Sequence, residues 1–482
     1  MLLVTSYSLS IVLIINFILT FIIIFLERKD PQSTYAWLLF IWIIPALGFL
    51  FYLIFSQNIA RRKIFKLYCD ELEITNKLLN QQKNDLISDK IVFEDSFREQ
   101  YKDIIHFHQN ISNSLYTNNN QIKIFTDGKE KFKNLFENID KAKDHIHAEY
   151  FIIKNDDLGK SFIELLTKKA NQGVEVRLLY DDLGGRFISN EVLKEFLAAG
   201  GKIGRFFPSK LKYINFKANY RNHRKIVVID GKVGYIGGFN VGDEYLGLKK
   251  KMGYWRDTHI RISGGAVYEL QLRFLLDWRS ATNEDVRLTS KFLTDDTFDG
   301  DIGIQIVSSG PDDVNEQVKQ GYLKIINSAR KYIFIQTPYF IPDQSMLEAL
   351  KIAAKSGIDV RIMIPNKPDH MFVYWATYSY VGDLVKYGAK AYIYNNGFLH
   401  SKTIISDDAI SSVGTCNFDI RSFRLNFEAN AFIYDQDIAT ELRDIFYEDM
   451  QVCTEVGYEE YKKRTIIIKL KESISRLFSP VL

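Results

Sequence analysis

The chain has 482 residues, of which 46% are hydrophobic and 25% are charged, and this balance excludes both a polytopic transporter and a largely disordered protein. Its 62 basic residues nearly balance its 59 acidic residues, so the net charge of +3 gives no signature of a nucleic-acid-binding protein. The three cysteines, Cys69, Cys416 and Cys453, lie far apart, which argues against a disulfide framework or a cysteine zinc site and fits a reducing compartment.

Two uncharged runs occupy the first 60 residues. Leu9–Leu26 and Tyr35–Phe55 each supply the roughly 20 apolar residues that a helix needs to cross a bilayer core. The first run has no basic start and no small-residue cleavage site, and a second run follows it, which argues against a cleaved signal peptide. We therefore expect a transmembrane hairpin over residues 1–60.

Basic residues near the two runs predict the orientation of this hairpin. They are Arg28 and Lys29 in the loop and Arg61, Arg62, Lys63 and Lys66 after the second run. The larger group marks the cytoplasmic side, so we expect residues 61–482 in the cytoplasm.

The rest of the chain repeats itself after a polar segment, 61–120, whose leucine and isoleucine spacing predicts connecting helices. Tyr150–Ile152 recurs as Tyr339–Ile341, and Gly173–Arg177 recurs as Gly357–Arg361. The predicted strand, helix and strand are Ile146–Ile153, Lys160–Asn171 and Val174–Tyr180 in the first copy, and Tyr332–Ile341, Gln344–Lys355 and Ile358–Ile364 in the second. This alternation predicts two α/β domains, 121–295 and 296–461, each with a mainly parallel sheet.

A stricter repeat follows, built on the pattern His-x-Lys-x4-Asp. The matched pairs, each 177 residues apart, are His223 and His400, Lys225 and Lys402, Asp230 and Asp407, Gly237 and Gly414, and Asn240 and Asn417. Because no gap interrupts the spacing, domain duplication is the simplest explanation. Helices are expected after each copy, at Val267–Trp278 and Asp437–Asp449.

The histidines and lysines of this repeat suit phosphate chemistry. Residues i and i+2 of a strand face the same side, so His223 should project with Lys225, and His400 with Lys402. A lysine neutralises phosphate oxygens while a histidine attacks phosphorus or transfers a proton. Two such half-sites can meet around one phosphorus, with one histidine as nucleophile and the other as acid.

Other polar residues of the repeat have predicted supporting roles. Asn240 and Asn417 can donate amide hydrogen bonds to the phosphate oxygens. Asp257 and Glu428, on strands expected beside the motif strands, can hold the second ring nitrogen of each histidine. Asp230 lies in an Asp-Gly turn signal, so it and Asp407 are expected to stabilise loops rather than touch substrate.

The remaining polar candidates have ordinary structural interpretations. The pairs His106 with His108 and His145 with His147 lack further ligands at a suitable spacing, so no metal site is expected. Asp369 lies in a polar loop and is expected outside the pocket.

The paired motifs resemble the HKD motifs of the phospholipase D superfamily. Residues 222–225, 397–402 and 414–423, the two N-terminal runs and Ser479-Pro480 are similar to its bacterial cardiolipin synthase branch, with Cys416 and Ile420 as small departures. The resemblance implies two α-β-α sandwich domains that share one site, no metal or organic cofactor, and a place in the bacterial cell membrane. It also counts Asp230 and Asp407 among the catalytic residues.

The activity implied by the resemblance is phosphatidyl transfer between two phosphatidylglycerol molecules, which gives cardiolipin and glycerol through a phosphohistidine. His223 would be the nucleophile and His400 the acid and base. A hydrolytic phospholipase D or a phosphatidylserine synthase of the same type shares the motifs. A nuclease is disfavoured by the apolar runs and the low net charge, and a non-catalytic scaffold by the intact motifs.

The C-terminal segment 462–482 is predicted to be a basic amphipathic helix. Six basic residues face one acid, Glu472, and an apolar stripe runs from Ile467 to Phe478. Such a helix packs on the second domain or lies in the surface of an anionic membrane.

Overall fold

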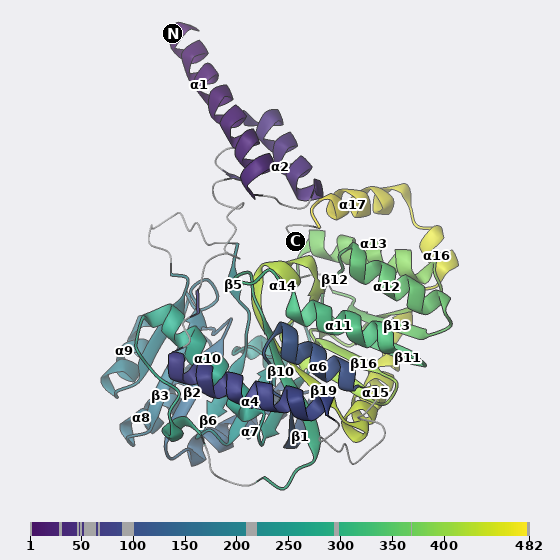
Figure 1. Ribbon diagram of the computed structural model, residues 1–482. Coiled ribbons are helices and arrows are strands. Elements are labelled where there is room, and N and C mark those ends of the chain that lie inside the picture. The colour runs from purple at the N-terminus through teal and green to yellow at the C-terminus, as the bar shows by residue number, and fades with distance from the viewer. Residues whose placement is uncertain are drawn as a thin grey trace. The chain divides into compact units, whose positions relative to one another are not determined.

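The computed structural model describes residues 2–27, 31–45, 48, 51–52, 64–65, 68–88, 101–208, 219–293, 298–367 and 369–479. The chain divides into two compact units, one of residues 1–61 and 208–220 and the other of residues 62–207 and 221–482 (Figure 1). Several positions used above lie outside the described residues: Arg28, Lys29, Arg61, Arg62, Lys63, Lys66, the expected domain boundary at 295–296, and residues 480–482.

The described part of the first unit is helical. Its elements are α1 (Leu2–Phe21), the π-helical turn η1 (Ile22–Glu27) and α2 (Pro31–Ile43). Asn16 of α1 donates its side-chain amide to the carbonyl of Ile41 (3.1 Å), and Trp42 donates to the hydroxyl of Thr20 (3.1 Å). Ile23 and Ile41 are fully buried in the same cluster. Among the described residues, no helix has both the length and the apolar character needed to cross a membrane.

One continuous sheet runs through the second unit. In the described residues it has 16 strands, and its order is β20-β14-β13-β11-β16-β17-β19-β10-β1-β9-β7-β6-β2-β3-β4, with β5 paired to β19. The strands before the midpoint of the chain are β1 (Thr117–Phe125), β2 (His145–Tyr150), β3 (Glu175–Asp181), β4 (Lys202–Phe206), β5 (Arg221–Asn222), β6 (Ile226–Ile229), β7 (Val233–Gly237), β8 (Trp255–Arg256) and β9 (His259–Ser263).

The second half repeats this strand order outward from a central antiparallel pair, β1 with β10. Its strands are β10 (Ile302–Ser309), β11 (Tyr332–Gln336), β12 (Phe340–Ile341), β13 (Asp359–Pro365), β14 (Lys390–Tyr394), β15 (Phe398–Leu399), β16 (Thr403–Ser406), β17 (Ile410–Gly414), β18 (Phe418–Asp419), β19 (Asn426–Tyr434) and β20 (Cys453–Glu455). The order β1-β9-β7-β6-β2-β3-β4 corresponds strand for strand to β10-β19-β17-β16-β11-β13-β14, so the duplication predicted from sequence is confirmed.

The expectation of a mainly parallel sheet is wrong. In the first half β2, β3 and β4 run parallel, but β2–β6, β6–β7, β7–β9 and β9–β1 are antiparallel pairs. Helical crossovers connect the parallel strands, whereas a tight turn at Asp230 and Gly231 connects β6 to β7. Strands joined by so short a turn must run antiparallel, so the sheet in each half is mixed.

Helices cover both faces of the sheet. In the first half these are α7 (Gly128–Lys141), α8 (Asp157–Asn171), α9 (Asn190–Ala198) and α10 (Val267–Thr282), with the short turns η2 (Asp243–Leu246) and η3 (Ser290–Phe292). In the second half they are α11 (Gln317–Ser328), α12 (Gln344–Lys355), α13 (Met371–Val385), α14 (Ile420–Arg424), α15 (Gln436–Met450), α16 (Tyr458–Lys462) and α17 (Ile466–Leu477).

The alternation of side chains along β6 shows why two helical layers form. Ile226 and Val228 join the cluster that contains residues of α10, whereas Val227 and Ile229 join the cluster under α7 and α8. Successive residues of a strand point to opposite faces, so a strand that is apolar at every position needs cover on both sides. The predicted helices at 160–171 and 344–355 are confirmed as α8 and α12.

The connecting segment forms α4 (Cys69–Ile87) and α6 (Lys102–Ile111) within its described residues. The expectation that it stays helical to residue 120 is wrong, because β1 begins at Thr117 and pairs with β9 and β10. Polar contacts attach α4 and α6 to the domains: Arg279 pairs with Glu71, and His108 contacts Gln305 (3.3 Å). No group of three potential metal ligands occurs in the described part of the chain.

Two aspartates hold the motif turns. Asp230 has a φ of 52°, and its carboxylate accepts backbone N–H groups from Lys143, Asp144 and His145, each at 2.9 Å. Three donors on one carboxylate fix the start of β2 against the turn after β6.

The second copy has the same arrangement. Asp407 has a φ of 59° and accepts backbone N–H groups from Arg330 (2.6 Å), Lys331 (2.9 Å) and Tyr332 (2.9 Å). Its carboxylate holds the start of β11.

We expect Asp230→Asn and Asp407→Asn to lower stability before they lower activity. An asparagine tolerates positive φ, but its one carbonyl oxygen replaces two charged oxygens, at a cost of about 1–3 kcal/mol. Thermal melts should show a lower midpoint, while the transfer rate per folded molecule stays within a few-fold. A stable but inactive Asp230→Asn protein would contradict this prediction.

Candidate active site

The position of His223 depends on a strand contributed by the other half of the chain. β5, which directly precedes His223, runs parallel to the start of β19 and pairs Asn222 with Phe427. The backbone N–H of His223 then donates to the carbonyl of Phe427 (2.9 Å). This register sets His223 beside the next residue of β19, Glu428.

The second half repeats this arrangement in reverse. β15, which precedes His400, runs parallel to β8 and pairs Leu399 with Arg256. The N–H of His400 donates to the carbonyl of Arg256 (2.7 Å), and the next residue is Asp257. The two histidines are therefore placed by the same construction, each with strands from both halves.

A carboxylate of the opposite half holds the imidazole of His223. Its Nδ1 lies 2.9 and 3.0 Å from the two oxygens of Glu428 and 3.1 Å from the carbonyl oxygen of Thr415. Glu428 is fully buried and also accepts the hydroxyl of Thr415 (2.5 Å) and the amide of Asn426 (3.2 Å). The ring packs edge-on against Phe151, 5.0 Å between centroids. These contacts fix Nδ1 as the donor and leave Nε2 free to react.

His400 is held in the same way from the first half. Its Nδ1 lies 2.6 Å from Oδ2 of Asp257, and its ring contacts Trp255, 5.1 Å between centroids. Asp257 is fully buried and accepts the backbone N–H of Thr258 (2.8 Å). The ammonium of Lys402 also lies 3.0 Å from Nδ1 of His400. Nδ1 of His223 has no such neighbour among the described contacts.

The two lysines of the motifs act on both histidines. Lys225 donates to the backbone carbonyl of His223 (2.6 Å), and Lys402 donates to that of His400. Burial, together with the charges of Lys225 and Lys402, lowers the pKa of His223 and that of His400 to about 4, although Glu428 raises the first and Asp257 the second. The charge of each lysine therefore influences both histidines, so the two half-sites lie within electrostatic reach of one another.

Burial also lowers the pKa values of the lysines themselves. The pKa of Lys225 falls to about 7, although Glu428 raises it, and that of Lys402 falls to about 8, although Asp257 raises it. Burial alone would raise the pKa values of Asp257 and Glu428, but the neighbouring cationic groups hold both below their ordinary values. Near neutral pH the site therefore has two carboxylates, two neutral imidazoles and lysines close to their own titration.

Two buried ion pairs support the strands that carry the site, and sequence reasoning did not find them. Arg224 donates to Asp277 of α10 (2.7 and 2.8 Å) and reaches across to the carbonyl of Glu428 (3.1 Å). Arg256 donates to Asp449 of α15 (2.9 and 3.0 Å). Arg224 occupies the middle of its motif, where the second motif has a serine. This break in the repeat is the sequence feature that could have pointed to the Arg224–Asp277 pair.

The two asparagines lie in loops and are engaged there. Asn240 accepts the backbone N–H of Ile152 (3.1 Å) and donates to the hydroxyl of Tyr245 (3.1 Å). Asn417 is buried, and its side chain hydrogen-bonds to Asp419. Binding of phosphate oxygens by these two asparagines stays a prediction. A catalytic role for Asp230 and Asp407 also stays a prediction, since their carboxylates accept hydrogen bonds from backbone N–H groups.

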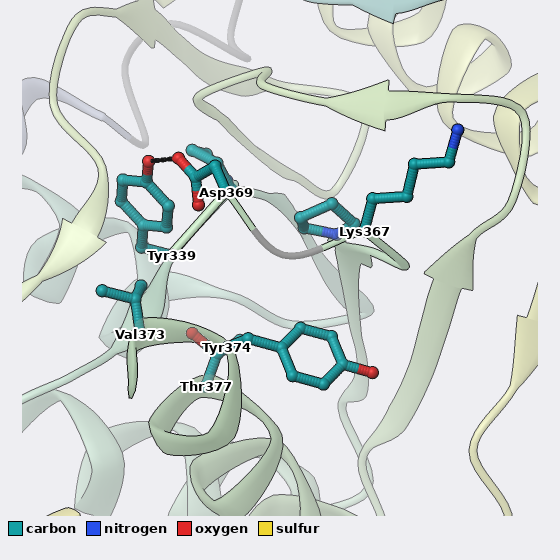
Figure 2. Close-up of a pocket in the computed structure, with 8 residues that line it drawn as sticks. Tyr339, Lys367, Asp369, Val373, Tyr374 and Thr377 are labelled. Atoms are coloured by element: carbon teal, nitrogen blue, oxygen red, sulfur yellow. Dashed lines mark hydrogen bonds between the residues drawn. The ribbon is translucent and has the colours of Figure 1, made fainter. Parts of the chain in front are cut away.

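A pocket lies in the second half of the chain (Figure 2). Its lining residues are Pro338, Tyr339, Pro365, Lys367, Asp369, Val373, Tyr374 and Thr377. Asp369 lines this pocket and accepts a hydrogen bond from the hydroxyl of Tyr339. Its charge raises the pKa of Lys402, in addition to the larger contributions of Asp257 and Glu428, so the pocket is within electrostatic reach of the motif. Figure 2 shows the Lys367 side chain extending away from the Tyr339–Asp369 pair.

Comparison with known proteins agrees with this geometry. Residues 135–259 and 322–450 match the family described as "Cardiolipin synthase, PLD-like domain", and residues 14–57 match "Phospholipase_D-nuclease N-terminal". The chain belongs to the PLD-like cardiolipin synthase family. It is therefore an enzyme, a phosphatidyltransferase of the phospholipase D type.

Relatives of this family cover the whole chain. The chain is 52% identical over 481 residues to the major cardiolipin synthase ClsA of Bacillus subtilis (strain 168), which covers 99% of this chain and 100% of that protein. It is 50% identical over 479 residues to a cardiolipin synthase of Oceanobacillus iheyensis, with the same coverage. A phosphatidylserine synthase structure from Haemophilus influenzae Rd KW20 has the same fold, with a TM-score of 0.61, 16% identity, and coverage of 80% of this chain and 100% of that one.

We expect Asp257→Asn to lower kcat/KM at least about 100-fold, because His400 loses the acceptor that orients it. The pH profile should change as well. In the parent, kcat/KM falls on the alkaline side as the lysines lose their protons near pH 7–8. Asp257 raises the pKa of Lys402, so its removal should move the alkaline limb to lower pH.

Asp449→Asn is the matched control, since Asp449 pairs with Arg256 and contacts neither motif histidine in the described structure. It should lower the melting midpoint without moving the alkaline limb. If the alkaline limb stays in place in Asp257→Asn, Asp257 does not raise the pKa of Lys402, and the prediction is refuted.

Proposed function

We propose that the chain is a cardiolipin synthase that transfers a phosphatidyl group from one phosphatidylglycerol to another through a covalent phosphohistidine. The observation that carries this proposal is the paired site: two imidazoles, each oriented by a buried carboxylate of the opposite half, with two lysines whose charges influence both. The high identity to proteins named cardiolipin synthases supports the choice of reaction within the family.

In the first step Nε2 of His223 attacks the phosphorus of phosphatidylglycerol. A P–N bond forms, and the bond from phosphorus to the head-group oxygen breaks. The imidazolium of His400 gives its proton to that oxygen, so glycerol leaves. Lys225 and Lys402 neutralise the phosphate oxygens as negative charge develops.

In the second step the head-group hydroxyl of another phosphatidylglycerol gives its proton to His400. The hydroxyl oxygen forms a bond to phosphorus as the P–N bond breaks, which releases cardiolipin and restores His223. The product keeps both phosphodiesters, and no other reactant is consumed.

The acid in the first step gains its proton when substrate binds. With pKa values of about 4, both imidazoles of the free site are neutral near pH 7. A phosphodiester carries a negative charge, and an opposite charge a few ångströms away favours a protonated imidazole. Substrate binding therefore raises the pKa of the histidine that must act as acid.

A difference between the half-sites supports His223 as the nucleophile. Nδ1 of His223 faces the carboxylate of Glu428 and a carbonyl, both acceptors, which fixes the tautomer with a free Nε2 lone pair. Nδ1 of His400 faces Asp257 and also the donor Lys402. A donor at Nδ1 favours a proton on Nε2, which suits the acid.

The proposal places residues 1–60 in the cell membrane as a two-helix hairpin and the catalytic domains in the cytoplasm. The two uncharged runs and the basic residues that follow them support this placement. Both substrates are lipids, so an anchor keeps the site at the surface where they are found. Protection of the C-terminal domains from protease in sealed inside-out vesicles would contradict the orientation.

Radiolabelled phosphatidylglycerol should yield labelled cardiolipin and glycerol with the parent protein, and neither His223→Ala nor His400→Ala should yield detectable cardiolipin. Loss of the nucleophile removes the covalent route, and loss of the acid lowers the transfer rate by at least about 100-fold. Melting curves of both variants should match the parent. Phosphatidic acid as the main product would indicate a hydrolase, and phosphatidylserine formed on addition of serine would indicate a phosphatidylserine synthase.

Quenching in denaturant at neutral to mildly alkaline pH, which preserves the acid-labile P–N bond, and peptide mapping should place the phosphatidyl adduct on His223. His400→Ala is the useful background, because it slows the second step and lets the adduct accumulate if the first step still occurs slowly. His223→Ala is its control and should carry no adduct. An adduct mapped to His400 in the parent protein would reverse the two roles.

A further inference from the structure

The C-terminal helix α17 packs on its domain with its polar side. Glu472 and Ser475 of this helix are 3% and 2% exposed, whereas most of its large apolar side chains face outward. This is the reverse of the usual arrangement, in which the apolar stripe of a surface helix faces the core.

Ion pairs and hydrogen bonds hold α17 in this orientation. Glu472 accepts two hydrogen bonds from Arg464 (2.7 and 2.9 Å) and one from the hydroxyl of Tyr461 (3.1 Å). Near the other end Arg476 donates to Asp383 of α13 (2.6 Å) and to Ser379 (3.3 Å). The outward apolar face is therefore part of a specifically held structure.

The exposed apolar residues form one continuous stripe with the start of α13. Its members on and after α17, with their exposed fractions, are Ile466 (81%), Ile467 (62%), Leu470 (60%), Ile474 (42%), Leu477 (80%) and Phe478 (48%). Met371 and Phe372 at the start of α13 are 55% and 54% exposed, and the ring of Phe372 contacts that of Phe478 (5.8 Å between centroids). Soluble proteins rarely leave so large an apolar patch in water without a partner for it.

Four exposed lysines flank this stripe: Lys462, Lys463, Lys469 and Lys471. The remaining basic side chains of the segment, Arg464 and Arg476, are used in the ion pairs with Glu472 and Asp383. The ammonium of Lys471 lies 5.1 Å from the ring centroid of Trp375, and the one acid of α17, Glu472, is buried away from the stripe.

We propose that α17 and the start of α13 form a membrane-docking surface for an anionic lipid bilayer, with the apolar stripe in the acyl boundary and the lysines on the head groups. An apolar helix face beside lysines is the arrangement of an interfacial helix. The surface adds a second membrane contact to the N-terminal segment and does not depend on the reaction proposed above.

The docking surface lies next to the pocket of Figure 2, because both share the start of α13. Val373, Tyr374 and Thr377 line the pocket, and Met371 and Phe372, just before them, belong to the stripe. Docking would therefore bring this pocket, and the motif lysine that Asp369 influences, to the level of the lipid head groups.

An environment-sensitive fluorophore on the full-length protein can test this surface. The label goes on Leu470→Cys, with Ile352→Cys as the matched control, since Ile352 is a 64% exposed isoleucine on α12. The parent chain, with its own three cysteines, gives the background. The protein is reconstituted in vesicles of phosphatidylcholine alone or mixed with phosphatidic acid, which has no head group to displace.

We expect the label at 470 to shift to the blue and to be quenched by bromine-labelled acyl chains in the anionic vesicles, while the label at 352 stays unquenched. Removing two lysine charges with Lys469→Gln and Lys471→Gln should lower the docking equilibrium constant by about five-fold per charge, and high salt should lower it as well. The pair Lys331→Gln and Lys355→Gln, at exposed positions outside the stripe, should leave the docked fraction unchanged.

Equal behaviour of the labels at 470 and 352 in anionic vesicles would overturn the proposal. Quenching that is the same with and without phosphatidic acid would overturn it too, because the lysines would then play no part. A blue shift without lipid quenching that grows with protein density would show that a second copy of the chain covers the stripe instead of the bilayer.

Discussion

Each motif histidine is held by a carboxylate that the other half of the chain supplies. Glu428 of the second half holds His223, and Asp257 of the first half holds His400. The short parallel pairs β5–β19 and β15–β8 fix this register through backbone hydrogen bonds. Because neither half contains a complete site, the continuous sheet through β1 and β10 is a requirement of the chemistry as well as of the fold.

Burying so many ionisable groups is tolerated because nearly every charge has a partner in place. Arg224 with Asp277 and Arg256 with Asp449 are buried pairs that hold the strands on either side of the site. Removing one member of such a pair is costly, since it leaves the other charge buried alone. The low dielectric that makes this burial costly also brings the lysine pKa values near neutrality and keeps the imidazoles neutral.

The duplication preserves the frame of the site but not its details. Arg224 of the first motif corresponds to Ser401 of the second, and only Nδ1 of His400 has an ammonium within 3.0 Å in the described structure. The second half also carries the pocket with Asp369 and the helix α17. These differences give the two histidines different surroundings within one repeated geometry.

The sequence by itself determined the duplication, the histidine and lysine pairs, one strand-helix-strand unit in each half, and the turn positions of Asp230 and Asp407, because spacing and periodicity are properties of the linear chain. It also pointed to Asp257 and Glu428. Only the tertiary structure decided that Glu428 holds the histidine 205 residues before it in the chain, that the sheet is mixed, and that α17 turns its polar side inward. These features depend on which surfaces of distant segments pack together, and residue spacing does not specify that.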